Sequence, residues 1–208
     1  MFRLGPCSVR GPLQYVTEWL RQTDGSAILE FAISLPLLVV FVVGIFDFSG
    51  AFNQKQKIEQ AAQEGAIVAG AQQTTDIYVG NPNANGPDSV QAVVTAVFNS
   101  LVGSNVIPNG TCTAPGTVTT SGLTWTYTIY NCSPSYASDT LVITVNRGLV
   151  LPGSPATTPP IPAVVESVVT VSYPYHWRFN SVIQLLVPGA SYAATSSLTE
   201  SASVHNQM

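Results

Sequence analysis

Residues 24–46 read DGSAILEFAISLPLLVVFVVGIF. Phe31 to Phe46 carries no charge, and Ala27 to Phe46 holds twenty residues with a single carboxylate, that of Glu30. About twenty consecutive apolar residues in a helix are enough to cross the hydrocarbon core of a bilayer. The sequence therefore predicts one transmembrane helix, with its span at about residues 27–48. It predicts no second one, because the other apolar stretches are too short.

The overall composition is apolar and poor in charge. Of the 208 residues, 46% are hydrophobic and 9% are charged, whereas an ordinary soluble domain has about 25% charged residues. Seven basic and eleven acidic side chains give a net charge of −4. This balance excludes a cationic surface for phosphates, so we expect no nucleic-acid partner. Two histidines and three cysteines leave little material for a metal centre, and we expect no metal and no cofactor.

Three interpretations of the N-terminal segment are open. The first is a cleaved secretory signal, with Ser-Gly-Ala at residues 49–51 as the cleavage site. Against it, the apolar run is longer than the usual 7–15 residues, and many residues precede it. The second is an uncleaved signal anchor. The third depends on Glu30, because an ionisable residue in a membrane segment is costly and is by default a functional residue.

A positive group close to Glu30 would make this carboxylate tolerable. A cut after Gly25 would create a new α-amine on Ser26, which has an ordinary pKa of about 8 and is mostly cationic at neutral pH. That amine would lie one helical turn before Glu30, or beside Glu30 of a neighbouring chain. Charge neutralisation between subunits in the membrane would then be possible.

The order of these residues resembles the class III signal of type IV prepilins. Gly25 is followed by Ser-Ala-Ile-Leu, then by Glu30-Phe31 and an apolar helix. The resemblance implies that a prepilin peptidase cuts after Gly25 and that residues 1–25 are a cytoplasmic leader. The leader is polar and mildly basic, as the positive-inside rule expects of a cytoplasmic segment.

A longer stretch, from Asp24 to Ala71, is similar to TadE-like proteins, which are pseudopilins or minor pilins of the tight-adherence (Flp, type IVc) pilus. The resemblance implies a structural subunit that works with other pilins and with proteins of the pilus assembly platform. Family members often carry Arg after the Glu-Gly-Ala piece, where this chain has Ile67. The matching positions are Gly25, Glu30, Phe31, Pro36, Gly44, Ala61, Ala62, Glu64, Gly65 and Ala66.

Residues 26–72 are expected to form one long helix that continues beyond the membrane. Pro36 is expected to kink it, and the kink either serves packing between helices or is simply tolerated, as in other membrane helices. Small residues form two adjacent i,i+4 rows that allow close approach of another backbone. That backbone belongs to another subunit, to a sheet of the same chain, or to both on different faces of the helix. The rows are Ala61, Gly65 and Ala69, and Ala62, Ala66 and Gly70.

Residues 73–208 are expected to form a periplasmic head, which makes the fold class α+β and pilin-like. A loop at 74–88 is followed by a helix from Asp88 or Ser89 to near Gly103, whose apolar residues recur at spacings of three and four. Alternation predicts an antiparallel sheet with strands at 123–130, 140–146 and 164–173, in which Glu166 faces water. Further expectations are a loop at 149–162 with five prolines, a short helix or turn at 179–187 and a weak strand at 191–204.

The cysteines indicate the compartment. Cys7 lies in the expected leader, which leaves Cys112 and Cys132. An even number of cysteines in an exported domain favours a disulfide, although two buried free thiols are the alternative.

No catalytic motif is present in the sequence, and we expect a protein without enzymatic activity or small-molecule substrate. His176, among aromatic residues, is expected to be a packed or surface residue, and His205 to be mobile near the C-terminus. The expected function is that of a pilin-like subunit of the bacterial inner membrane, with lipid, a prepilin peptidase and other pilins as its partners. The alternative is an uncleaved, single-pass periplasmic binding or adhesion protein.

Overall fold

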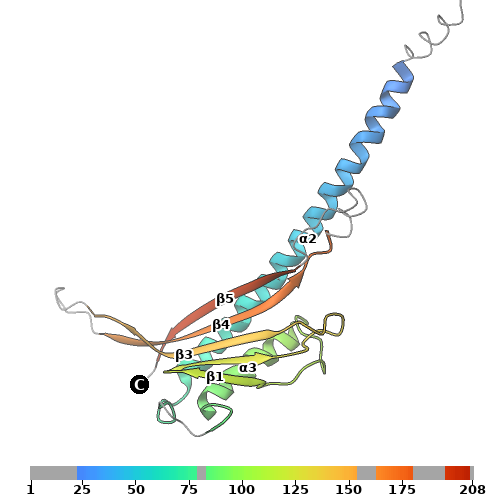
Figure 1. Cartoon of the computed structure of the whole chain (residues 1–208). Coiled ribbons are helices and arrows are strands. Elements are labelled where there is room, and N and C mark those ends of the chain that lie inside the picture. The colour runs from blue at the N-terminus through green and yellow to red at the C-terminus, as the bar shows by residue number, and fades with distance from the viewer. Residues whose placement is uncertain (1–22, 79–82, 154–162, 180–194, 207–208) are drawn as a thin grey trace, which may run out of the picture. The chain divides into compact units, whose positions relative to one another are not determined.

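The computed structural model describes residues 23–78, 83–153, 163–179 and 195–206 (Figure 1). The chain divides into two compact units, residues 1–46 and 47–208. The long helix α2 (Thr23–Ala71) contributes its first part to one unit and its second part to the other. The expected division at residue 73 followed the end of the helix, whereas the contacts divide the chain within the helix.

The first part of α2 is apolar and exposed. The helix continues through Pro36, and it begins three residues before the expected Ser26. Side chains such as Phe31, Leu37 and Phe41 are each more than half exposed. Among the described residues, one helix (Gly25–Ala71) is long and apolar enough to cross a membrane, and its most apolar window is not buried in the protein. A surface of this kind requires lipid or other apolar helices around it.

The second helix, α3 (Asp88–Gly103), has the expected bounds and apolar face. Asp76 accepts a hydrogen bond of 2.9 Å from the backbone N–H of Ser89, and so satisfies a donor in the first turn of the helix. At the other end, Lys57 Nζ donates a hydrogen bond of 2.8 Å to the carbonyl of Ser104. The buried residues of the helix are Ser89, Val90, Val93, Val94, Val97 and Leu101.

Within the described part of the chain, five antiparallel strands follow in sequence order across one sheet. They are β1 (Thr117–Ser121), β2 (Thr124–Ile129), β3 (Leu141–Leu151), β4 (Val164–His176) and β5 (Thr195–His205). The alternating sequence therefore forms a meander, in which each strand pairs with its neighbour in the chain.

The structure corrects several boundaries. β1 was not expected, because this short exposed edge strand has no apolar alternation. The expected loop at 149–162 is wrong at its start, since Leu149 pairs with Glu166 and Leu151 with Val164. Of the expected strand at 191–204, residues 195–204 are in β5. Residues 191–194, and nearly all of the helix or turn expected at 179–187, lie outside the described residues.

Glu166, near the start of β4, and His205, at the end of β5, also differ from expectation. Glu166 does not face water freely, because its side chain is 12% exposed and its Oε1 lies 3.2 Å from Nδ1 of His205. His205 is itself a strand residue that pairs with Glu166. Cross-strand pairing covers the carboxylate and places the backbone of His205 in the sheet, while its side chain is 65% exposed.

The two faces of the sheet differ in chemistry. The inner face packs against α3 and the second part of α2 through a core of buried apolar side chains, including Ile58, Val97, Trp125, Ile143 and Val169. Figure 1 shows α3 and the second part of α2 on one side of the sheet. The outer face is rich in hydroxyl groups, and one row of direct cross-strand partners consists of Thr119, Thr126, Thr144, Thr170 and Ser201.

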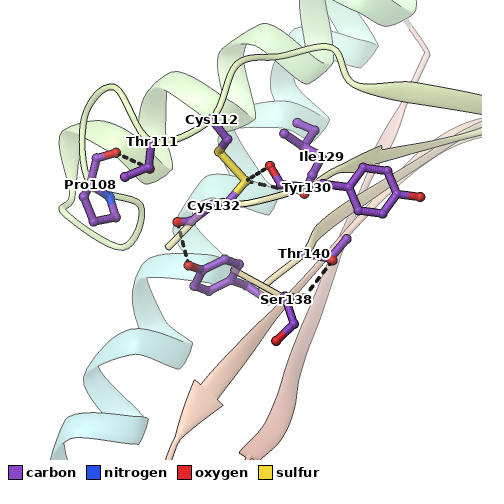
Figure 2. The surroundings of a disulfide bond; sticks show 9 residues. Pro108, Thr111, Cys112, Ile129, Tyr130, Cys132, Ser138 and Thr140 are labelled. Carbon is purple, nitrogen blue, oxygen red and sulfur yellow. Dashed lines mark hydrogen bonds between the residues drawn. A yellow bond between two sulfur atoms is a disulfide. The ribbon is translucent and has the colours of Figure 1, made fainter. Parts of the chain in front are cut away.

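The disulfide Cys112–Cys132 is present, with its Cα atoms 4.9 Å apart (Figure 2). It connects the segment after α3 to the end of β2. Tyr173 Oη donates a hydrogen bond of 3.0 Å to the carbonyl of Cys132. The bridge is thus tied to β4, and the alternative of two free thiols is wrong.

Candidate functional site

The expected processing residues lie at the beginning of α2, in the first unit. Gly25 has no atom within 4 Å of where a Cβ would stand. Ser26 and Glu30 are exposed, and Phe31 is 65% exposed. These residues therefore face the surroundings of the helix, where an enzyme or a neighbouring chain can reach them.

The small residues in the second part of α2 lie against the chain's own head. A Cβ on Gly65 would collide with Val97 of α3 and would lie 3.2 Å from Val169 of β4. A Cβ on Gly70 would lie 2.8 Å from Val204 of β5. The alanines of both rows, Ala61, Ala62, Ala66 and Ala69, are at most 2% exposed. These rows were expected to contact another subunit or the same chain. In the structure they contact α3 and the sheet of the same chain.

The second unit begins at a buried carboxylate. Asp47 is 6% exposed. Tyr175 Oη, near the end of β4, lies 2.9 Å from Asp47 Oδ1 and 3.0 Å from its carbonyl oxygen, and the N–H of Phe179 donates to Oδ2 at 2.7 Å. Gly50 makes room for this contact, because a Cβ there would stand 2.8 Å from Tyr175 Oη. We call Asp47, Tyr175 and Phe179 the exit clamp, since they hold the end of β4 on the helix just after the apolar stretch.

The exit clamp changes the acid–base behaviour of its tyrosine. Burial raises the pKa of Tyr175 to about 12, and the hydrogen bond and charge of Asp47 act in the same direction, whereas Arg178 lowers it. The phenol is therefore a stable donor at every physiological pH. Because its acceptor is a charged oxygen, the hydrogen bond is of the stronger, charge-assisted type.

Two further aromatic rings, those of Phe48 and Trp177, lie beside the exit clamp. Phe48 meets Trp177 edge-on with ring centroids 5.2 Å apart, and Tyr175 meets Trp177 edge-on at 5.0 Å. Trp177 Nε1 donates a hydrogen bond of 2.6 Å to Ser196 Oγ. These contacts connect α2, the end of β4 and the start of β5 in one cluster.

A buried arginine holds the other end of α2. Arg147 of β3 is 3% exposed. Its Nη2 donates to the carbonyls of Ala69 at 2.7 Å and Gln72 at 3.0 Å, and its Nη1 to that of Gln73 at 3.2 Å. A cation here satisfies carbonyls left free at the helix C-terminus and complements the helix dipole. Burial lowers the pKa of Arg147 from its ordinary value, and the charge of Asp76 opposes this change.

The sequence predicted neither the exit clamp nor the contacts of Arg147 with the end of α2. Asp47 and Tyr175 are 128 residues apart, and Arg147 is a single basic residue in a strand. The one usable signal was the cost of a charge in an otherwise apolar strand, since buried charges need a partner. It could have indicated that Arg147 binds something, but not that it binds the end of a helix.

His176 has partners of its own. Its Nε2 lies 2.8 Å and 3.0 Å from the two carboxylate oxygens of Asp139, its Nδ1 lies 3.1 Å from Thr195 Oγ1, and Tyr136 stacks on its ring at 3.5 Å. As expected, this histidine is packed. The described residues contain no group of three or more His, Cys, Asp or Glu side chains that could hold a metal ion.

The comparisons with known proteins point to one family. The family model described as TadE-like protein matches residues 25–66. The match begins at Gly25 and includes Glu30, Pro36 and the small residues up to Ala66, while the sheet lies outside it. No curated protein and no solved structure matches the chain. The resemblance drawn from the residues is thus confirmed for this segment.

Proposed function

We propose that this protein, which carries a TadE-like segment at residues 25–66, is a pilin-like structural subunit that acts in assembly of a tight-adherence pilus. The observation that carries the proposal is the division of α2. Its first part exposes apolar side chains on all sides, and its second part is packed into an α+β head. A subunit of this form anchors in a membrane and presents a folded domain, and it needs no reaction of its own.

In this proposal the first part of α2 crosses the bacterial inner membrane once. The N-terminus lies in the cytoplasm and the head in the periplasm. The basic residues before Gly25 support this orientation under the positive-inside rule. The Cys112–Cys132 disulfide supports an oxidising compartment for the head.

A prepilin peptidase cuts between Gly25 and Ser26 in the proposed pathway. Gly25 presents no side chain to obstruct the enzyme, and its surroundings are open. The new amine of Ser26 then neutralises Glu30 of the same chain or of a neighbour. Pairing between neighbours would set the axial register of the subunits.

The packing of α2 restricts where other pilins can bind. Because Gly65, Gly70 and the buried alanines are occupied by the chain's own head, they are not free for another subunit. The surfaces proposed for subunit contacts are the exposed residues before 47 and the outward side of α2 in the second unit. Phe52 and Ile67, at 61% and 65% exposure, lie on that side.

The mature N-terminus tests the proposal. The full chain, with a tag after Met208, is produced with and without a prepilin peptidase, and the intact mass is measured. The expected product begins at Ser26 only when the peptidase is present. Gly25→Val abolishes the cut, whereas Gly44→Val, at a second glycine of the same helix, leaves it intact. A product that begins at Phe52 would indicate an ordinary signal peptidase, and a product that begins at residue 1 an uncleaved anchor. Either result would overturn the proposed processing.

A further inference from the structure

We infer that the end of β4 and the residues after it, Tyr175–Phe179, sit in the headgroup layer of the membrane and bind phospholipid. The inference rests on the proposed function in so far as residues before 47 span that membrane. The inference depends on the position of the Tyr-His-Trp-Arg-Phe segment, residues 175–179. The exit clamp holds this segment against α2 at Asp47, the first residue of the second unit.

The first step is the position of Asp47. It is the first charged residue after the uncharged stretch 31–46, so the hydrocarbon-compatible part of the helix ends there. Its carboxylate is covered by the Oη of Tyr175 and the N–H of Phe179, at 2.9 Å and 2.7 Å. The end of β4 is therefore fixed at the level where the chain leaves the hydrocarbon.

The second step is the chemistry of the side chains held at that level. Tyr and Trp are enriched at membrane interfaces, because their rings are apolar while their O–H and N–H groups are polar. Tyr175 and Trp177 each place the polar group in a hydrogen bond within the protein, which removes the cost of bringing it near the hydrocarbon. Phe48, in contact with Trp177, is 70% exposed.

The third step is charge. The basic groups of Lys55, Lys57 and Arg147 are engaged by Glu200, by the carbonyl of Ser104 and by the end of α2, respectively. Arg178, in contrast, is exposed and directly follows Trp177. A basic residue near the surface of a bilayer is attracted to anionic lipid headgroups. An exposed cation beside aromatic rings fits the phosphate groups of a lipid surface.

These steps predict that the end of β4 and the aromatic rings around Trp177 contact lipid at the surface of the membrane. The disulfide lies at the same end of the sheet as the end of β4, because Ile129 pairs with Leu141 and Val142 with Ser172, and Tyr173 donates a hydrogen bond to the carbonyl of Cys132.

Fluorescence quenching in vesicles tests the inference. The full chain with Trp19→Phe is reconstituted in phosphatidylcholine–phosphatidylglycerol vesicles that carry bromine near the headgroup end or near the methyl end of the acyl chains. The signal of Trp177 is the difference from a Trp177→Phe variant, and the buried Trp125 stays as an internal reference for folding. We expect that signal to be quenched, and more strongly by bromine near the headgroups.

Matched variants separate the inference from the membrane anchor. Tyr175→Phe removes only the hydroxyl of the exit clamp and should reduce the quenching, whereas Tyr130→Phe, at an exposed tyrosine elsewhere, should leave it unchanged. Arg178→Gln should reduce it in vesicles with phosphatidylglycerol but not in pure phosphatidylcholine.

If the chain floats with the vesicles while Trp177 is quenched by neither lipid, the inference is overturned and the anchor stands. If Trp177 is shielded from quenching only when the protein self-associates, this surface binds a second copy of the chain. That result would also overturn the inference. A chain that does not float with vesicles would overturn both.

Discussion

Arg147 of β3 donates a hydrogen bond of 2.7 Å from Nη2 to the carbonyl oxygen of Ala69, in the last turn of α2. Its Nε also lies 3.3 Å from Ser167 Oγ, which in turn donates to Asn206 at 2.6 Å. One guanidinium thus connects the end of the long helix to two neighbouring strands and to the residue after β5. The geometry suits arginine, whose planar fork offers five donors.

Arg147→Met should destabilise the head strongly. The substitution fills a similar volume but removes the donor from the buried carbonyl of Ala69 and from the part-buried carbonyls of Gln72 and Gln73. The expected loss is about 3 kcal/mol of unfolding free energy, measured by urea unfolding of the full chain in detergent. Lys55→Met is the matched control. It removes a pair whose lysine is 48% exposed, and should cost less than about 1 kcal/mol. Equal effects of the two substitutions would contradict the helix-capping role of Arg147.

Gly65→Ala should lower stability although alanine is the better helix former. The added methyl would collide with Val97 and press on Val169, and overpacking of this kind costs about 1–3 kcal/mol. Gly103→Ala, in α3, meets no atom within 4 Å. It should leave stability unchanged or raise it by up to about 1 kcal/mol. Thermal unfolding of both variants compares them, and a stabilised Gly65→Ala protein would show that the helix does not pack this closely on the sheet.

The part of the fold that follows from local pattern could be predicted. α3 and the alternation in β2 through β4 are visible because buried apolar side chains repeat every three to four or every two residues. β1, with Val118 as its only apolar residue, carries no such signal. The end of β4 could not be located either, since Pro174 argues against a strand. In the structure Pro174 lies within the ladder, opposite Ser197.

The same distinction holds for the candidate site: features within one helix can be predicted from the sequence, and contacts between distant residues cannot. The proposed processing residues and the rows of small residues could be singled out from the sequence, because each set lies within one helix and has a fixed spacing. The exit clamp and the Arg147 contacts join residues far apart in the chain, so only the folded arrangement reveals them. The rows of small residues show a further limit, since their spacing predicts a close neighbour but not whether that neighbour is the same chain or another one.

The Cys112–Cys132 disulfide should stabilise the head by about 3 kcal/mol, mainly by restricting the unfolded chain. The test compares unfolding of the Cys7→Ser protein with and without reductant, so that no third thiol can exchange. The double variant Cys112→Ser/Cys132→Ser, in the same background, should unfold at the stability of the reduced protein and lose its response to reductant. An unchanged stability after reduction would contradict this contribution.

Alkaline pH should unfold the head through its buried tyrosines. Burial raises the pKa of Tyr127 to about 12, and burial together with the charge of Asp139 raises that of Tyr173 to about 12. The unfolded chain releases these protons near pH 10. The stabilising effect is therefore complete below pH 10 and is lost as the pH rises from 10 towards 12, by up to about 1.4 kcal/mol per pH unit for each tyrosine. Melting temperatures between pH 8 and 11.5 should fall less steeply for Tyr127→Phe, while Tyr130→Phe should keep the steep profile. Parallel profiles for all three proteins would contradict the prediction.

Glu30→Ala should allow membrane insertion but impair pilus assembly. Removing the carboxylate makes the helix more apolar, so insertion should not suffer. The amine of Ser26, created by the proposed cut, would then have no acid to pair with in the same or the next chain. Membrane fractionation measures the first effect, and electron microscopy of sheared pili together with co-purification of other pilins measures the second.

Glu30→Gln keeps the size of the side chain but not its charge, and should fail like Glu30→Ala if the charge matters. Glu59→Gln, at an exposed position in the second unit, should assemble normally. Normal piliation in both Glu30 variants would remove the charge-pairing role from the proposal and would leave the membrane anchor as the only function of this part of α2.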